Sequence, residues 1–244
     1  MSNFSYLGGV EIGADVYDYD ISEVLYVDTP SGILAVALNG VGGGVSSYEV
    51  MPDGSLSYVA TRSYTSSTRD FQTVQSTVVN VFDINFVIVG AGSGGEFYGH
   101  IISDDGSVSK LKRLPATPGA PGDIISMVEI SNDGSIARII TVTDEGFVQL
   151  RSMTKLGESL GDAQTIDLFQ ADIAHFDLVR VNGNIILVTT EHLTGDVVTY
   201  SYNPTSHATQ EVGRNGASEG VGLGTPTDFV TIVVDSMTYV VAAS

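Results

Sequence analysis

Short apolar runs recur along the chain at a nearly constant interval. Their starts are separated by 53, 52, 47 and 53 residues, and none of them shows helical periodicity. After each of the first four runs, glycine-rich or acidic residues lead into a segment in which apolar and polar positions alternate, which indicates a strand with one buried face. The five runs are ILAVAL (33–38), FVIVGA (86–91), RIITVT (138–143), IILVTT (185–190) and TYVVAA (238–243).

Two further strands complete each repeat. A tight turn leads from each alternating segment to a more polar strand, expected at 55–61, 107–113 and, less clearly, 162–168 and 208–214. Another β-rich segment stands ahead of each apolar run, at 21–28, 76–83, 124–131 and 174–181. The chain therefore carries four strands in each repeat, with Asp-Gly turns between several of them.

This repeat is typical of a β-propeller. We predict an all-β fold of four-stranded antiparallel blades that forms a single domain over residues 1–244. Because the apolar runs are apolar on both faces, we expect them to be the innermost strands. A β-sandwich is the alternative. The blades are expected near 21–65, 74–114, 123–168 and 174–214, with an incomplete last blade at 226–244 that takes a strand from 4–11.

The last blade lacks part of its strand set. Between 238–243 and 4–11 one strand would be missing, and its absence would leave unpaired N–H and C=O groups on an apolar edge. We therefore expect either that these 244 residues belong to a longer propeller or that another chain completes the edge.

The stretch FVIVGAGSGG contains a motif of the dinucleotide-binding type, with Gly90, Gly92 and Gly95 at its three glycine positions. A dinucleotide site needs a helix after the last glycine, because the helix N-terminus holds the pyrophosphate. Here the next residues, EFYGHII, alternate like a strand. The motif resembles the flavin-binding opening of glucose–methanol–choline oxidoreductases over eleven residues only. We predict that the chain binds neither FAD nor NAD.

Composition narrows the choice of partners. The chain has 29 acidic and 10 basic residues, for a net charge of −19. Such a surface repels phosphate backbones and anionic lipids, so we expect neither nucleic acid as a partner nor membrane insertion. It would attract cations such as Ca²⁺, although acidity alone also serves solubility. The absence of cysteine excludes disulfides and thiolate sites, and no ordinary signal peptide is visible.

The repeat resembles the lactonase-like, YVTN-type propellers, most closely over 33–60 and 86–114. This resemblance implies the fold rather than one activity. A narrower likeness is to the N-terminal propeller of bacterial hemolysin-type calcium-binding proteins. It implies calcium binding and an extracellular protein exported by a type I-like route, although the G-G-x-G-x-D repeats of that family are missing. A cytoplasmic location is the alternative.

Two groups of residues are candidates for chemistry. Asp15, Asp18 and Asp20 could supply oxygen ligands to a hard cation such as Ca²⁺, or could simply be a solvated loop. Asp172, His175 and Asp177 could supply a general base or hold a metal, with a polar loop as the alternative. Glu191 and His192 stand one strand further on, and by chain direction we expect them at the opposite end from Asp172.

The sequence favours a non-catalytic recognition or scaffold module of a secreted bacterial protein, because no motif demands chemistry. Its protein or carbohydrate partner is not identified by any motif. A lactonase-like hydrolase acting through the Asp172, His175 and Asp177 loop is one alternative, and a calcium-binding propeller is the other.

Overall fold

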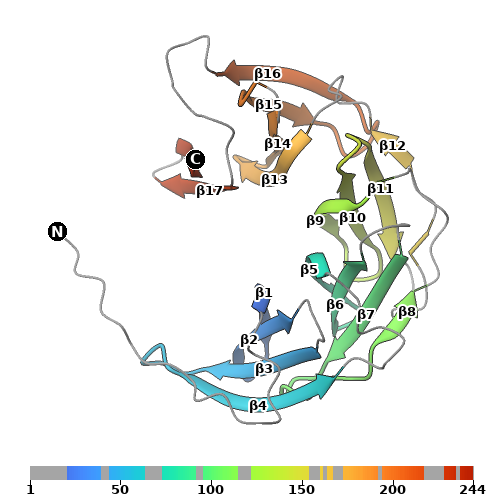
Figure 1. The fold of residues 1–244 in the computed structure, drawn as a ribbon, viewed down its shortest axis with the longest axis vertical. Coiled ribbons are helices and arrows are strands. Elements are labelled where there is room, and N and C mark those ends of the chain that lie inside the picture. The colour runs from blue at the N-terminus through green and yellow to red at the C-terminus, as the bar shows by residue number, and fades with distance from the viewer. Residues whose placement is uncertain are drawn as a thin grey trace.

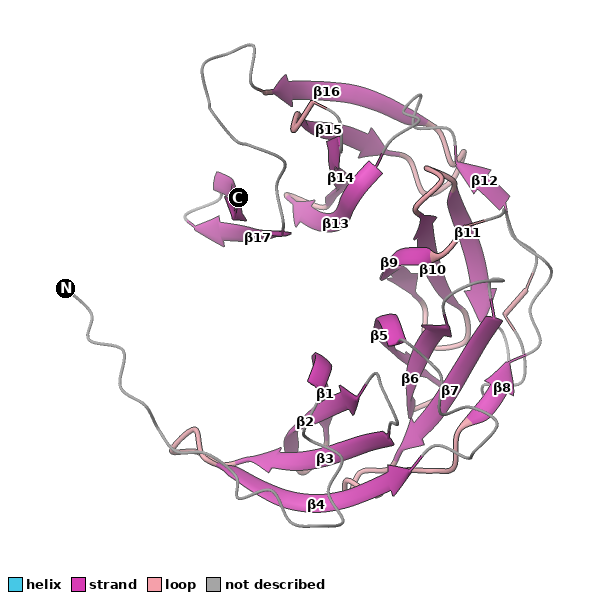
Figure 2. Ribbon diagram, viewed as in Figure 1, coloured by secondary structure: helices cyan, strands magenta, loops and turns pink. Residues whose placement is uncertain are grey.

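The computed structural model describes residues 21–39, 44–63, 73–91, 96–114, 122–153, 160–161, 164–166, 173–191, 194–216, 228–234 and 237–243. These residues form strands, turns and loops and contain no helix, so none that could cross a membrane (Figure 2). The all-β fold class is confirmed: the strands make four antiparallel four-stranded sheets and one hairpin.

Each four-stranded sheet is built from strands that follow one another along the chain. The first sheet contains β1 (Ile21–Thr29), β2 (Gly32–Asn39), β3 (Gly44–Val50) and β4 (Leu56–Ser63). The second contains β5 (Thr73–Val81), β6 (Ile84–Ala91), β7 (Glu96–Ile102) and β8 (Lys112–Leu114). The third contains β9 (Ile124–Asn132), β10 (Ala137–Thr143), β11 (Val148–Met153) and β12 (Gln164–Ile166). The fourth contains β13 (Ile173–Val181), β14 (Asn184–Glu191), β15 (Val197–Tyr202) and β16 (Thr209–Asn215), and the hairpin contains β17 (Asp228–Val234) and β18 (Met237–Ala243).

The sheets stand around a common centre as the blades of a propeller do (Figure 1). The described strands trace an arc, in which the β17–β18 hairpin follows the fourth sheet and contacts it through β13. The predicted N-terminal strand at 4–11 lies outside the described residues, so its place in the last blade stays a prediction.

The apolar runs are second in each sheet rather than innermost, which corrects the sequence-based expectation. The innermost strands are β1, β5, β9 and β13, which lie nearest the centre and contact one another in succession. The reason is physical: a second strand has a paired neighbour on both edges and a sheet against both faces, whereas a first strand has one edge free. The first strand can therefore carry polar side chains.

The core consists of the seams between successive sheets. The side chains of β2 alternate, and Leu34, Val36 and Leu38 pack against the second sheet in a buried cluster that includes Val87 and Val89. A second cluster joins the second and third sheets, and a third joins the third and fourth. Because each seam buries mainly apolar side chains, every sheet depends on its neighbours for burial.

One position on the third strand of each sheet carries a large buried polar side chain. These residues pair with Ala35, Val87, Ile139 and Leu187 of the second strands. They are Tyr48, His100, Arg151 and Tyr200, all no more than 4% exposed. His100, Arg151 and Tyr200 each face the preceding sheet along the arc, whereas Tyr48 belongs to the first sheet, and no described sheet precedes it.

Two of these buried groups show how the seams accommodate polarity. The Arg151 guanidinium lies 4.8 Å from the centre of the Phe97 ring in the preceding sheet and donates to Gln149. His100 shares a hydrogen bond of 2.9 Å between its Nδ1 and the Ser109 carbonyl, and burial lowers its pKa to about 4. His100 is therefore neutral in the folded protein at ordinary pH.

The fourth strand of the second sheet is shorter than the sequence suggests. A strand was expected at 107–113, but β8 begins only at Lys112, after a single bridge at Val108. The Ser109 hydroxyl accepts a hydrogen bond of 2.7 Å from the Ile101 amide and so replaces a backbone partner. A side chain that competes with the ladder in this way cannot be recognised from periodicity.

Two turn glycines provide a test of the seam. Gly106 and Gly134 both have positive φ, +80° and +83°, but a Cβ at Gly106 would lie 2.8 Å from Val59 Cγ1 of the first sheet, whereas a Cβ at Gly134 would meet nothing within 4 Å. We expect Gly134→Ala to cost about 1 kcal/mol through backbone strain. Gly106→Ala should cost a further ~1–3 kcal/mol through overpacking. Urea denaturation measures both, and equal losses would contradict the packing described.

Candidate functional site

The four inner strands share an irregularity at the same place. In each complete sheet one residue of the first strand is left unpaired near its start, which is a β-bulge. The bulged residues are Ser22, Val74, Ile125 and Ala174. The residues that follow them are Glu23, Gln75, Ser126 and His175. All four can form hydrogen bonds, and they stand at one end of the inner strands; we call them the post-bulge residues.

Two of the post-bulge side chains, Glu23 and Ser126, form hydrogen bonds to the next inner strand. Glu23 accepts a hydrogen bond of 2.5 Å from the Ser76 hydroxyl on β5. Burial raises the pKa of the Glu23 carboxyl, and the Ser76 bonds oppose that rise only in part. In the third sheet the Ser126 hydroxyl donates to the Phe176 carbonyl at 3.0 Å. The post-bulge position thus places hydrogen-bonding groups between neighbouring inner strands.

His175 and Asp177 lie on one face of β13, as the sequence alternation predicted. His175 pairs with Thr190 and Asp177 with Val188 across the β13–β14 ladder. Phe176 points the other way, into the core shared with the third sheet, so His175 and Asp177 face the β17–β18 side. The two residues are therefore neighbours on one surface. Asp172 lies outside the described residues, and its part in the site stays a prediction.

Two polar side chains beside this end have unused hydrogen-bonding capacity. Thr190, the cross-strand neighbour of His175, is fully buried and its hydroxyl has no hydrogen-bond partner among the described residues. Asn39, at the corresponding end of β2, is also fully buried, and within the described part of the chain neither its oxygen nor its nitrogen is hydrogen-bonded. Such groups are costly to bury unless something satisfies them.

Glu191 lies at the same end as His175, which corrects the expectation that it sits opposite. It pairs with Ile173 because β13 and β14 are joined by a tight turn and run antiparallel in one sheet. His192 lies outside the described residues.

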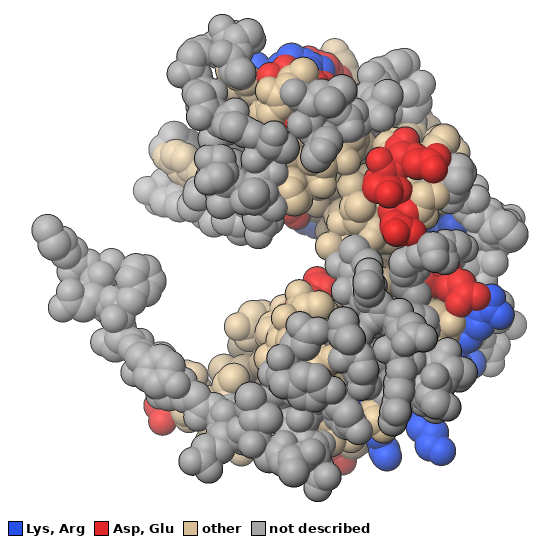
Figure 3. Space-filling model, in the orientation of Figure 1, with Lys and Arg blue, Asp and Glu red and all other residues tan. Residues whose placement is uncertain are grey.

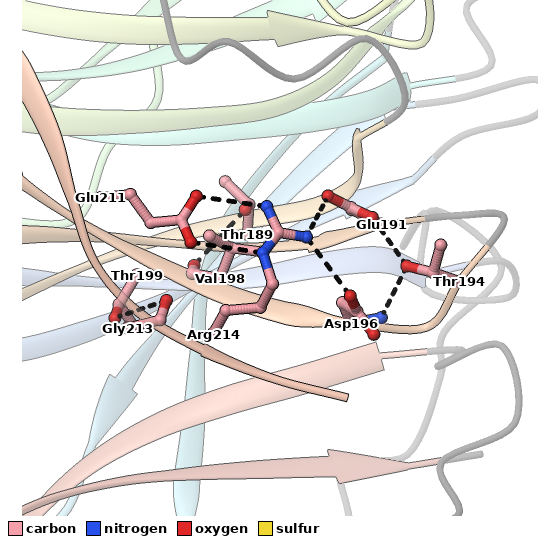
Figure 4. Close-up of polar contacts among 9 residues, drawn as sticks. All are labelled: Thr189, Glu191, Thr194, Asp196, Val198, Thr199, Glu211, Gly213 and Arg214. Carbon is pink, nitrogen blue, oxygen red and sulfur yellow. Dashed lines mark hydrogen bonds and ion pairs between the residues drawn. The ribbon is translucent and has the colours of Figure 1, made fainter. Parts of the chain in front are cut away.

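The Glu191 carboxylate is held in an ion-pair network (Figure 4). Arg214 on β16 lies 2.7 Å from Glu191, 3.3 Å from Asp196 and 3.2 Å from Glu211. Thr194 also donates to Glu191 at 2.7 Å. Hydrogen bonds to Glu211 and Glu191 raise the pKa of Arg214 further, so the guanidinium stays charged. Glu191 thus ties β14 to β16 and is poorly placed to act as a base.

The candidate metal ligands Asp15, Asp18 and Asp20 fall outside the described residues, so calcium binding stays a prediction. Within the described ranges no group of three or more His, Asp or Glu side chains could hold a metal ion.

The glycine stretch gives a clearer result for the fold, because β6 ends at Ala91 and the next described element is the strand β7. Gly92 and Gly95 are not described, and the expected absence of FAD and NAD stays a prediction.

The face seen in Figure 3 carries a group of acidic side chains over the third sheet, while basic side chains lie toward the outer rim. The contacts agree: Asp123 and Asp144 are joined by backbone and side-chain hydrogen bonds, and Arg113 pairs with Glu96 on the outer strands of the second sheet.

Sequence reasoning missed Glu23, Asn39 and Thr190. Glu23 is equivalent to His175 only when the four inner strands are aligned on the bulge. The residue types do not reveal where a bulge lies. Asn39 and Thr190 stand at the ends of apolar runs, where the sequence pattern of a single polar residue is typical of the start of a loop.

Comparison with known proteins shows the fold. Neither protein-family models nor curated proteins gave a match. Among solved structures, the periplasmic gluconolactonase of Pseudomonas aeruginosa has a TM-score of 0.56 at 19% identity over 90% of this chain and 65% of its own. A Bacteroides uniformis protein named as a candidate 6-phosphogluconolactonase has a TM-score of 0.51 at 17% identity, over 89% of this chain and 76% of its own. The GH32 β-fructofuranosidase of Bombyx mori has 0.53 at 11%, over 92% and 56%.

The likeness to lactonase-like propellers is thereby confirmed for the fold, while the hemolysin-type likeness stays a prediction. The chain spans 65% and 56% of the gluconolactonase and fructofuranosidase, so both are considerably longer than the part that resembles it.

The raised pKa of Glu23 predicts a pH-dependent stability difference. Because the folded state favours the protonated carboxyl, the contribution of Glu23 to stability is fully present below its ordinary pKa of 4.5 and is lost as the pH rises through the folded value. The Glu23→Gln variant cannot ionise at this position. The difference between its free energy of unfolding and that of the wild type should therefore shift in favour of the variant as the pH rises from acid to neutral. Urea denaturation across that range measures the gain.

Glu49→Gln, on the exposed end of β3, is the matched control and should run parallel to the wild type. A Glu23→Gln difference that stays constant with pH would contradict the assignment.

Proposed function

We propose that the protein is a lactonase-like hydrolase that acts on a neutral sugar lactone at the post-bulge end of the inner strands. The observation that carries this proposal is the recurring bulge, which sets Glu23, Gln75, Ser126 and His175 at the same position of four successive inner strands. A gluconolactonase is among the solved structures with the same fold, which supports the hydrolase over the scaffold favoured by sequence alone.

Lactone hydrolysis needs a base and an acid. His175 is the proposed general base, which takes a proton from water as the water oxygen attacks the lactone carbonyl carbon. When the ring C–O bond breaks, the leaving alkoxide must receive a proton. Glu23 is the proposed donor, because burial raises its pKa and favours the protonated carboxyl. Asp177, on the same face as His175, would favour the imidazolium that forms.

The hydroxyl groups of a sugar lactone need several hydrogen-bonding partners. Gln75 and Ser126 stand at the equivalent positions between Glu23 and His175 along the arc. Asn39 and Thr190 lie beside the same end, but their side chains are fully buried, so they would support the site without contacting the substrate. Gln75 and Ser126 are uncharged, which suits a polyol.

The distribution of charge favours a neutral substrate over a phosphorylated one. A phosphate group needs Arg or Lys donors, and none of the described ones stands at the post-bulge positions. Arg214 is the basic residue near this end of the fourth sheet, and three carboxylates already surround it. The described Lys and Arg side chains are Arg62, Lys110, Lys112, Arg113, Arg138, Arg151, Arg180 and Arg214.

The runner-up is a non-catalytic recognition or scaffold module, presumed secreted on sequence grounds alone. The exposed apolar face of the first sheet favours it, since contiguous apolar surface often marks a protein contact. Calcium binding by Asp15, Asp18 and Asp20 is a separate proposal for the segment ahead of β1.

The test is hydrolysis of glucono-1,5-lactone and its 6-phosphate, followed as acid release at constant pH. We expect turnover of the neutral lactone in preference to the phosphate ester. His175→Ala should lower kcat by about 100-fold or more, the usual contribution of a general base. The rate should fall at higher pH as Glu23 loses its proton, and Glu23→Gln should remove this fall from the pH–rate profile.

His207→Asn is the control, because His207 bonds Tyr202 at the opposite end of the fourth sheet and Asn tolerates its positive φ. This variant should keep full activity. A folded wild type that hydrolyses no lactone would favour the scaffold, and equal losses in the His175 and His207 variants would refute the site.

A further inference from the structure

One face of the first sheet exposes a continuous set of large apolar side chains. The ladder places Val24 opposite Ala37, Tyr26 opposite Ala35 and Tyr48 opposite Tyr58, all on one side. The exposed members of this face are Val24 (45%), Tyr26 (68%), Ile33 (44%), Leu56 (44%) and Tyr58 (45%). We call it the outer face of the first sheet, because the second sheet covers the opposite side.

The equivalent face of the following sheets is covered. Ala35 and Ala37 correspond to Val87 and Val89 of the second sheet, which are 0% and 1% exposed because the first sheet packs on them. Val78, the counterpart of Tyr26, belongs to the same seam. The outer face of the first sheet therefore has the apolar composition of a seam, but no described sheet packs against it.

Tyr48 indicates the same incompleteness. Its counterparts His100, Arg151 and Tyr200 all face a preceding sheet, and Arg151 lies on a ring of that sheet. Tyr48 contacts Tyr58 edge-on, with ring centres 6.0 Å apart, but among the described residues its buried hydroxyl has no hydrogen-bond partner. A partner surface on this face would supply one.

Charge does not oppose an occupant here. Among the described strands of the first sheet, the register puts one charged side chain on the outer face, Asp28 at the end of β1. These strands can therefore approach another apolar sheet without burying several carboxylates of their own.

The β17–β18 hairpin stands at the other end of the arc and has the register of a further seam. β17 contacts β13 on one side, and Tyr239 of β18 is 44% exposed. Tyr239 pairs with Ile232 as Leu34 pairs with Val27, which makes Tyr239 the counterpart of Leu34. Leu34 packs in the seam that contains Val78. In a repeated seam, Tyr239 and Tyr26 would thus lie in the same apolar cluster.

We propose that the outer face of the first sheet binds the β17–β18 hairpin of a second copy of this chain, head to tail. The contact repeats between molecules the sheet-on-sheet seam that occurs three times within one molecule. Because the two surfaces differ, the contact is heterologous and either closes into a ring or propagates. Added salt strengthens it, because the remaining negative charge of the copies repels.

The chain has no cysteine, so introduced cysteines are unique reporters. A Tyr26→Cys preparation is mixed with a Tyr239→Cys preparation and treated with a short bis-maleimide. We expect a covalent dimer in the mixture, at least ten times more than in either preparation alone. Val212→Cys, on the exposed part of β16, replaces Tyr26→Cys in the control mixture and should give none.

Sedimentation velocity gives the independent readout. The wild type should shift to larger species with rising protein and salt concentration, and Tyr26→Ser should remain monomeric with an unchanged circular dichroism spectrum. Val212→Ser should behave as the wild type. A wild type that stays monomeric throughout would overturn the proposal, as would cross-linking within single molecules of a Tyr26→Cys/Tyr239→Cys double variant, which would mean that the chain covers its own face.

Discussion

The face-to-face packing of one sheet on the next is the interaction on which the rest of this structure depends. A single four-stranded sheet cannot bury both faces of its apolar second strand, so each sheet depends on its neighbours for burial. The second strands are buried along almost their whole length for this reason, as in Val87, Ile88 and Val89. Polar groups enter the seams only with a suitable neighbour, as Arg151 does over the Phe97 ring.

The same packing explains the bulge and links the fold to the candidate site. Ile173 and Phe176 both lie in the core shared with the third sheet, although three positions apart they would point to opposite faces of a regular strand. The unpaired residue Ala174 restores the face of Ile173. The bulge therefore serves burial first, and the polar side chain that follows it is placed at the strand end as a consequence.

Much of the architecture could be predicted from the sequence, because repeats and alternation are local patterns. The four-strand repeat and the strand after Gly90 depend only on the spacing of apolar residues. The order of strands from the centre could not be predicted this way, since an apolar run such as 33–38 suits an inner and a second strand equally. His175 and Asp177 could be placed on one face by their spacing of two. The equivalence of Glu23 to His175 could not be predicted, because it depends on a bulge that the residue types do not reveal.

Electrostatics separates the two carboxylates nearest the candidate site. Glu191 and Glu23 both stand at the same end of their sheets, but Arg214 forms an ion pair with the first while burial raises the pKa of the second. The pKa of a carboxyl rises where cations are distant and solvent is reduced. The seam beside β1 provides both conditions, because the second sheet covers it and its polar contact is the Ser76 hydroxyl. The packing that stabilises the sheets thus also shifts the pKa of Glu23 in the direction that the proposed acid requires.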